Sequence, residues 1–264
     1  MKKTIRRFAP AMLVLVALAT LSFMANDGVT LRLRPQQDKT YTITSKANMM
    51  MMMEVQGMNM NQSQSIETRQ SFTAKEVTDT ESTIETQIEA MKLTISQMGM
   101  KLEYDSEHPE KTSPMLASQT KEIEKYLNKP ETVKYDLMGN VIDSLGIQMS
   151  QLGAVINELP EEEVNVGSTW TLNKSQDMSG NALNAKYTYT VTAISKKSVD
   201  VSITGTVIGD SNDANGSYEG TASFNPQTGL VMNSSIKTNV SMTMSEQGMT
   251  FPVTMVGTTT IEVK

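Results

Sequence analysis

Alternation of apolar and polar residues with a period of two is the feature that most constrains the fold of this chain. From Tyr41 to Val55 most odd-numbered residues are apolar, and a run of five methionines, Met49–Met53, lies within this pattern. Such alternation predicts a β-strand with one buried face. The odd-numbered methionines therefore continue that face, whereas Met50 and Met52 predict that the opposite face is also partly covered.

Strand alternation returns through most of the chain, and two segments near its middle have helical spacing instead. A change of phase between Ile88 and Met91 predicts a β-bulge, and Gly99 predicts a hairpin turn. Apolar residues have helical spacing instead at about 114–128 and at about 145–158. The sequence therefore predicts long strands interrupted by two helices.

Similar segments recur in the two halves of the chain. KTYTITSK at 39–46 is similar to STWTLNKS at 168–175, and VKYDLMGNV at 133–141 is similar to ASFNPQTGLV at 222–231. Such repetition predicts two related β units. We expect an α+β fold that is mainly β with two helices: a duplicated antiparallel sheet, strongly curved or half-barrel-like, with helices covering its concave face. Residues 26–264 would form one domain, with halves at about 29–143 and 164–264 joined by a helical segment at about 144–160.

The first 25 residues have the order of a secretory signal. Four cations, the last of them Arg7, precede an apolar run from about 11 to 23, and small residues follow. We expect residues 1–25 to be removed on export to the periplasm or cell envelope of a bacterium, whereas an uncleaved segment would attach the protein to the membrane. The chain contains no cysteine, which excludes disulfides and thiolate chemistry.

The composition argues against nucleic-acid binding and against catalysis. The formal net charge is −6, so phosphate backbones are poor partners. His108 is the only histidine, which excludes triads and zinc-histidine sites. The acidic run Glu161–Glu163 reads as a solvated turn, and DSNDANG at 210–216 reads as a hairpin loop because it lacks the final glutamate of a calcium loop. We expect no enzyme activity and no cofactor.

Methionine is unusually frequent, with 22 residues in a chain that is only 5% aromatic. Three interpretations remain open: ordinary core filling, a deformable lining for an apolar ligand, and soft thioether ligands for Cu(I) or Ag(I). The candidate Cu(I) ligands are Met49, Met51, Met53, Met58 and Met60. The candidates for the lining of an apolar cavity are Met49, Met51, Met53, Phe72, Met91, Met98, Met100, Leu116, Ile123, Leu127, Met242, Met244 and Phe251.

Several segments carry a resemblance to a known group of proteins. They are LPEEEVNVGSTWTL at 159–172, YDS at 104–106 and GMTFPVTMVGTTTIEV at 248–263. With the amino-terminal signal they resemble a family of secreted bacterial β-rich proteins, often lipoproteins, of unknown function, over nearly the whole mature chain. The resemblance implies no activity, and this chain lacks the lipid-modified cysteine of many relatives. The expected fold is also similar to the open half-barrels of periplasmic lipoprotein and lipid carriers.

These features lead to one main functional hypothesis and two alternatives. We expect a non-catalytic envelope protein that binds a hydrophobic or lipid-like molecule, or another envelope component, in a methionine-lined concavity. One alternative is a methionine-rich protein that binds Cu(I) or Ag(I). The other is a structural or interaction protein of the envelope whose sheet edges pair with a partner.

Overall fold

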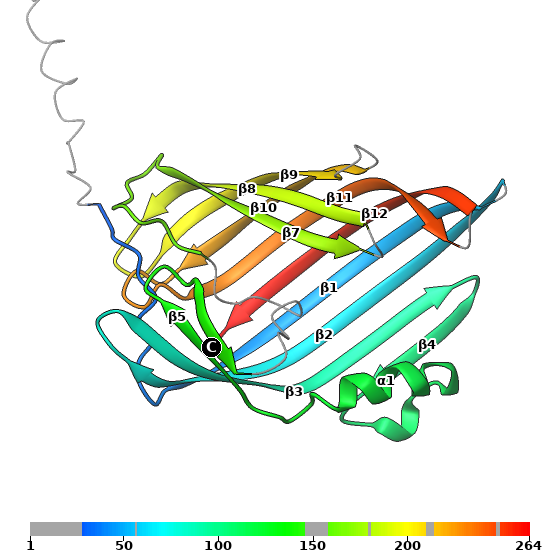
Figure 1. The fold of residues 1–264 in the computed structure, drawn as a ribbon, viewed down its shortest axis with the longest axis horizontal. Helices are drawn as coiled ribbons and strands as arrows, with labels where there is room; N and C mark the ends of the chain where they lie inside the picture. The colour runs from blue at the N-terminus through cyan, green and yellow to red at the C-terminus, as the bar shows by residue number, and fades with distance from the viewer. Residues whose placement is uncertain (1–27, 56, 146–157, 179–180, 210–213, 247–248) are drawn as a thin grey trace, which may run out of the picture.

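One antiparallel sheet of 12 strands dominates the structure (Figure 1). It is seen in a computed structural model that describes residues 28–55, 57–145, 158–178, 181–209, 214–246 and 249–264. The strands are β1 (Thr40–Val55), β2 (Met58–Val77), β3 (Glu81–Gln97), β4 (Met100–Asp105), β5 (Glu131–Asp136), β6 (Val141–Leu145), β7 (Thr169–Met178), β8 (Asn181–Ile194), β9 (Val199–Gly209), β10 (Ala214–Phe224), β11 (Val231–Glu246) and β12 (Met249–Val263).

The two β blocks of the sequence form a single continuous sheet. The strand order is β6-β5-β3-β2-β1-β12-β11-β10-β9-β8-β7, and β4 pairs with the second half of β3. The first and last strands join the blocks, because β1 pairs with β12 from Ile43↔Val263 to Met53↔Val253. The expected bulge in β3 is confirmed, since Arg69 pairs with Ala90 and the next residue, Gln70, pairs with Ile88.

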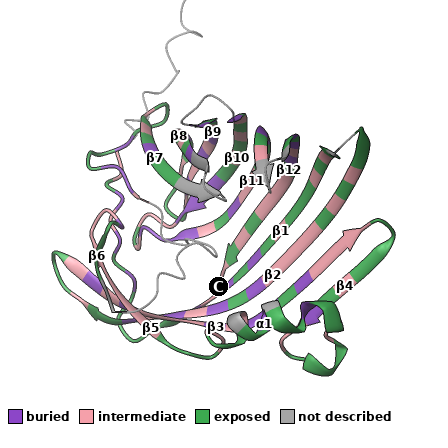
Figure 2. Ribbon diagram, turned by 45° about the vertical axis from the view of Figure 1, so that its right-hand side comes forward, coloured by how far each residue is buried: buried purple, intermediate pink, exposed green. Residues whose placement is uncertain are grey.

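The sheet curls so that one face is concave, as Figures 1 and 2 show. Packing across the curl is direct: Tyr41 of β1 and Phe72 of β2, whose rings stack at 4.7 Å, share a buried cluster with Val191 of β8 and Val201 of β9. We call the concave side the inner face and the other side the outer face. On β1 the odd-numbered residues from Tyr41 to Met53 point to the inner face.

Glycines on the inner face allow this strong curvature. A Cβ atom at Gly220 would lie 2.2 Å from the carbonyl oxygen of Ser235, and one at Gly216 would lie 2.5 Å from the carbonyl oxygen of Asn239. Strand backbones therefore approach each other more closely at these positions than a side chain permits. Glycine at such positions is the usual means by which a sheet bends sharply.

Loops fill one end of the inner face. Leu31 and Leu33 from the segment before β1 are fully buried. Val29 and Val164 exchange two backbone hydrogen bonds of 2.9 Å, and Arg32 donates to the carbonyl oxygen of Pro160 at 3.0 Å. We call this part the closed end; its buried residues include Leu31, Leu33, Tyr41, Ile43, Phe72, Ile84, Leu159, Val164, Leu172, Tyr189, Val191, Phe224 and Leu230.

The expectation that helices cover the concave face is wrong. The helix expected at 114–128 is reduced to a 3₁₀ turn, Pro114–Leu116, and α1 (Ala117–Glu124), which lies at one edge of the sheet beside β4 (Figure 1). Leu145 of the second expected helix belongs to β6, where it pairs with Thr132. Residues 146–157 of that helix, like the expected signal at 1–25, lie outside the described residues. The fold is therefore nearly all β, an open antiparallel sheet whose curvature buries its own apolar face.

Candidate ligand-binding surface

Methionines gather at the end of the inner face that lies opposite the closed end. β1 begins in the closed end at Tyr41 and reaches the opposite end at Met51 and Met53. Met51 pairs with Met255 of β12, and Met53 pairs with Met60 of β2. We call this part the methionine end; its buried residues are Leu183, Val207, Ala214, Val240, Met242, Phe251, Val253 and Met255, with Met51, Met53, Ala185, Tyr218 and Met244 packed against them.

In the methionine end, flexible methionine side chains lie over buried, branched valine side chains. Val240 and Val253, branched residues on the paired strands β11 and β12, are almost fully buried. Met51, Met53 and Met244 pack against this base and keep part of their side chains exposed. Because a thioether chain is unbranched and polarizable, it can change rotamer and follow the shape of an apolar molecule. The surface can therefore deform where the base cannot.

The candidates for the cavity lining divide into four groups. Met51, Met53, Met242, Met244 and Phe251 come together in the methionine end. Phe72 lies in the closed end. A third cluster, beside β3 and β4, contains Met91, Leu116, Ile123 and Leu127. Met49, Met98 and Met100 are exposed and belong to none of the buried clusters of the described residues.

Strand pairing adds residues that the candidate set lacks. Met255 completes the methionine end because it lies opposite Met51, and Val253 lies opposite Met53. Alternation within 249–263 places these residues on the buried face of a strand, but nothing local pairs that strand with β1, which lies at the other end of the chain. The pairing of the first strand with the last is therefore the piece of information that the sequence pattern cannot supply.

The expected cover over the even-numbered methionines is absent in the described part of the chain. Met50 is 50% exposed and Met52 is 37% exposed, both on the outer face of β1. On β2 their neighbours on that face are polar, since Met50 pairs with Ser63 and Met52 with Asn61, and on β12 the neighbour of Met50 is Val256, itself 43% exposed. Apolar residues on both faces of a strand therefore do not indicate two covering layers here.

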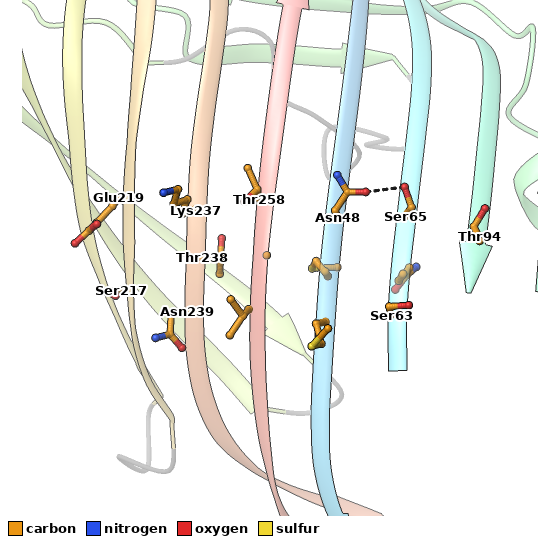
Figure 3. A pocket seen from close by; sticks show the side chains of 15 residues that line it. Asn48, Ser63, Ser65, Thr94, Ser217, Glu219, Lys237, Thr238, Asn239 and Thr258 are labelled. Carbon is orange, nitrogen blue, oxygen red and sulfur yellow. Dashed lines mark hydrogen bonds between the residues drawn. The ribbon is translucent and has the colours of Figure 1, made fainter. Parts of the chain in front are cut away.

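A shallow hollow of about 660 Å³ lies mainly on the outer face (Figure 3). Within it Ser65 donates a hydrogen bond of 2.8 Å to the side-chain oxygen of Asn48. Lys237 of β11 lies opposite Glu219 of β10 in the strand register. Most of the residues that line it carry hydroxyl, amide or charged side chains, and an acyl chain laid over them would remove water from those polar groups. The complete lining is Asn48, Met49, Met50, Ser63, Gln64, Ser65, Thr94, Ser217, Glu219, Lys237, Thr238, Asn239, Val256, Gly257 and Thr258.

Two stacked pairs of aromatic rings lie on the inner face, one in the closed end and one where the closed end meets the methionine end. Tyr187 stacks on Tyr218 with ring centroids 4.8 Å apart, and Trp170 stacks on Tyr189 at 5.0 Å. Burial raises the pKa of Tyr189 to about 12, and burial also raises the pKa of Tyr187. Both phenols therefore stay neutral at physiological pH and add no charge to the inner face.

The residues considered for acid, base or metal chemistry lie apart from the inner face. His108 is exposed, with Nδ1 3.5 Å from a carboxylate oxygen of Glu110. Glu161–Glu163 are exposed, and residues 210–213 of the rejected calcium loop lie outside the described residues. Within the described ranges no three His, Cys, Asp or Glu residues are grouped so that they could hold a metal ion. No helix among the described residues is long and apolar enough to cross a membrane.

Comparison with solved structures finds weak likenesses. One is to a structure titled as lipid-protein interactions in lipovitellin, with a TM-score of 0.49 and 10% identity over 87% of this chain, which spans only 25% of that chain. Another is to the translocator domain of the autotransporter NalP from Neisseria meningitidis, with a TM-score of 0.37 and 8% identity over 85% of this chain and 88% of that one.

Comparison of sequences finds one partial match, to a family model. No curated protein matches the chain. The model of a family of unknown function, DUF6263, matches residues 147–239, which begin shortly after β6, include β7 to β10 and end within β11. The match covers less of the chain than the resemblance seen in the sequence. Residues 147–239 are thus similar to a family whose function is unknown, in agreement with the expectation of an uncharacterised family.

Proposed function

We propose that this protein is a non-catalytic protein of the bacterial envelope that binds a hydrophobic or lipid-like molecule on the methionine end of its inner face. One observation carries the proposal: Met51, Met53 and Met244 are partly exposed on the concave side of an open sheet, over a base of buried valines. A concave, deformable and apolar surface suits an acyl chain, because each methylene group removed from water contributes about 0.8 kcal/mol.

The two faces of β1 allow a matched test of this proposal. Met53 points to the inner face and its neighbour Met52 points to the outer face, and both keep part of their side chains exposed. Met53→Glu places a carboxylate where the bound chain must exclude water, so we expect at least about tenfold weaker binding. Met52→Glu places the same carboxylate in solvent, and we expect binding to be unchanged.

The measurement is a fluorescence titration with cis-parinaric acid, an acyl probe that brightens in apolar surroundings. All variants carry Leu15→Glu and Leu18→Glu in the full chain, so that the apolar amino-terminal run cannot hold the probe. We call this chain the parent. Equal losses in Met53→Glu and Met52→Glu, or a parent that does not bind the probe at all, would show that the inner face is not the binding surface.

The strand register also favours a second candidate function, the binding of Cu(I) or Ag(I). Met53 lies directly opposite Met60, and Met51 lies directly opposite Met255. Thioethers brought together in this way are ligands for soft monovalent metals. Met60→Leu keeps the apolar volume and removes one sulfur. Under the lipid proposal this variant keeps its affinity for cis-parinaric acid, whereas a metal-binding function predicts that a Cu(I) titration against a competing chelator shows at least about tenfold weaker binding.

A further inference from the structure

One row of directly opposed residues crosses the inner face from β7 to β3. Residues that lie opposite each other in an antiparallel sheet share a face, and the register of each neighbouring pair of strands continues the row. It passes through the methionine end, because Val207, Val240 and Met255 belong to that buried cluster. The row consists of Lys174, Ala185, Val207, Gly216, Val240, Met255, Met51, Gln62 and Gln97.

Lys174 is the first residue of this row and points to the inner face. Trp170 and Leu172, which precede it on β7 at intervals of two, pack in the closed end, so strand alternation places Lys174 on the same face. Its partner across the register, Ala185, packs against the methionine end. Lys174 is exposed and forms no ion pair with another described residue. Its ammonium is therefore available to a bound molecule.

Positive charge lies at one end of an otherwise uncharged row. Among the described side chains that β1 and β7–β12 direct to the inner face, Lys174 is the only charged one. The far end of the row carries two neutral amides, Gln62 and Gln97. An amphiphile that lies along the row therefore meets a charge of opposite sign only if its head group is anionic and is placed at β7.

We infer that Lys174 holds the head group of the bound molecule and that this molecule is a fatty acid. The inference rests on the proposed function and adds the ligand class to it. A single ammonium balances the single charge of a carboxylate. β7 and β12 are five strand spacings apart, about 24 Å along the sheet, and the flexible lysine stem shortens the distance that the acyl chain must cover. The chain then reaches Met255 while its carboxylate meets Lys174.

Lys174→Gln tests the head group separately from the chain. Fluorescence titrations compare cis-parinaric acid with its methyl ester, which has the same chain and no charge. We expect the substitution to weaken binding of the acid to the parent by about fivefold, the effect of one partly exposed ion pair. Binding of the ester should not change, because the ester has no charge for Lys174 to balance.

Lys186→Gln is the matched control. Lys186 is exposed on the neighbouring strand β8 and follows Ala185, so it points to the outer face, and we expect both probes to bind this variant as they bind the parent. An inward lysine on an edge strand also discourages pairing between sheets, but that role affects acid and ester alike.

Three results would overturn the inference and leave the proposed function standing. They are unchanged binding of the acid by Lys174→Gln, equal weakening of acid and ester, and a loss in Lys186→Gln as large as in Lys174→Gln. In each case Met53→Glu still tests the inner face in the same assay. A parent that binds neither probe would overturn the inference and the proposed function together.

Discussion

Replacing Gly220 by valine is expected to destabilise the protein by about 3 kcal/mol or more, because this is the size of an overpacking penalty that the surrounding backbone cannot relieve. A Cβ atom at Gly220 would lie 2.2 Å from the carbonyl oxygen of Ser235 and 2.9 Å from Cα of Ile236. Both atoms belong to the backbone of β11, which is hydrogen-bonded on its other side to β12. Relief would require β10 to move away from β11, and the inner face would open. Urea unfolding followed by circular dichroism measures the loss.

Thr221→Val is the matched control for this substitution. Thr221 is the next residue of β10 and is exposed on the outer face, so a valine there fits a strand without a clash. We expect its free energy of unfolding to stay within about 0.5 kcal/mol of that of the parent. If Gly220→Val is as stable as Thr221→Val, the close approach of β10 and β11 does not set the curvature, and the account of the inner face fails with it.

Phe224→Ala is expected to cost about 3–5 kcal/mol, the usual loss when a large side chain is removed from a filled core. Phe224 is fully buried in the closed end, and its ring lies 6.2 Å from that of Trp170 at an angle of 59°. At this chain length the melting temperature should fall by roughly 10 °C. Trp170 is the only tryptophan, so its fluorescence reports directly on the loosened packing.

Phe251→Ala provides the comparison at the other end of the inner face. Phe251 lies opposite Met244 in the β11–β12 register. The neighbouring thioethers can move into the vacated space, so we expect a loss of about 2 kcal/mol or less. Losses of equal size at Phe224 and Phe251 would mean that the two ends are packed alike, and the methionine end would then be ordinary core.

Local sequence patterns predict the strands of this protein well because their causes are local. Alternation from Tyr41 predicts β1, the change of phase after Ile88 predicts the bulge in β3, and Gly99 predicts the β3–β4 turn. Each feature depends on a few neighbouring residues. The methionine run lies in β1 as the alternation requires.

The cover of the apolar face could not be predicted in the same way. An alternating strand shows that one face is buried but does not show whether a helix or a curled sheet buries it. Leu145 fits a helical pattern and yet pairs with Thr132 in β6, because a neighbouring strand edge outweighs a short helical preference. The pairing of β1 with β12 depends on residues at opposite ends of the chain, and the close approaches at Gly216 and Gly220 depend on the register between β10 and β11.

Methyl NMR of the methionines most directly tests whether the inner face binds an acyl chain. The parent chain is labelled with ¹³C at the methionine methyl groups, titrated with oleate, and assigned by single Met→Leu substitutions. We predict that the methyl signals of Met51, Met53 and Met244 shift with oleate, while those of Met52 and Met115 do not. Shifts confined to Met52 and Met115, or no shift at Met51, Met53 and Met244 at saturating oleate, would contradict the account.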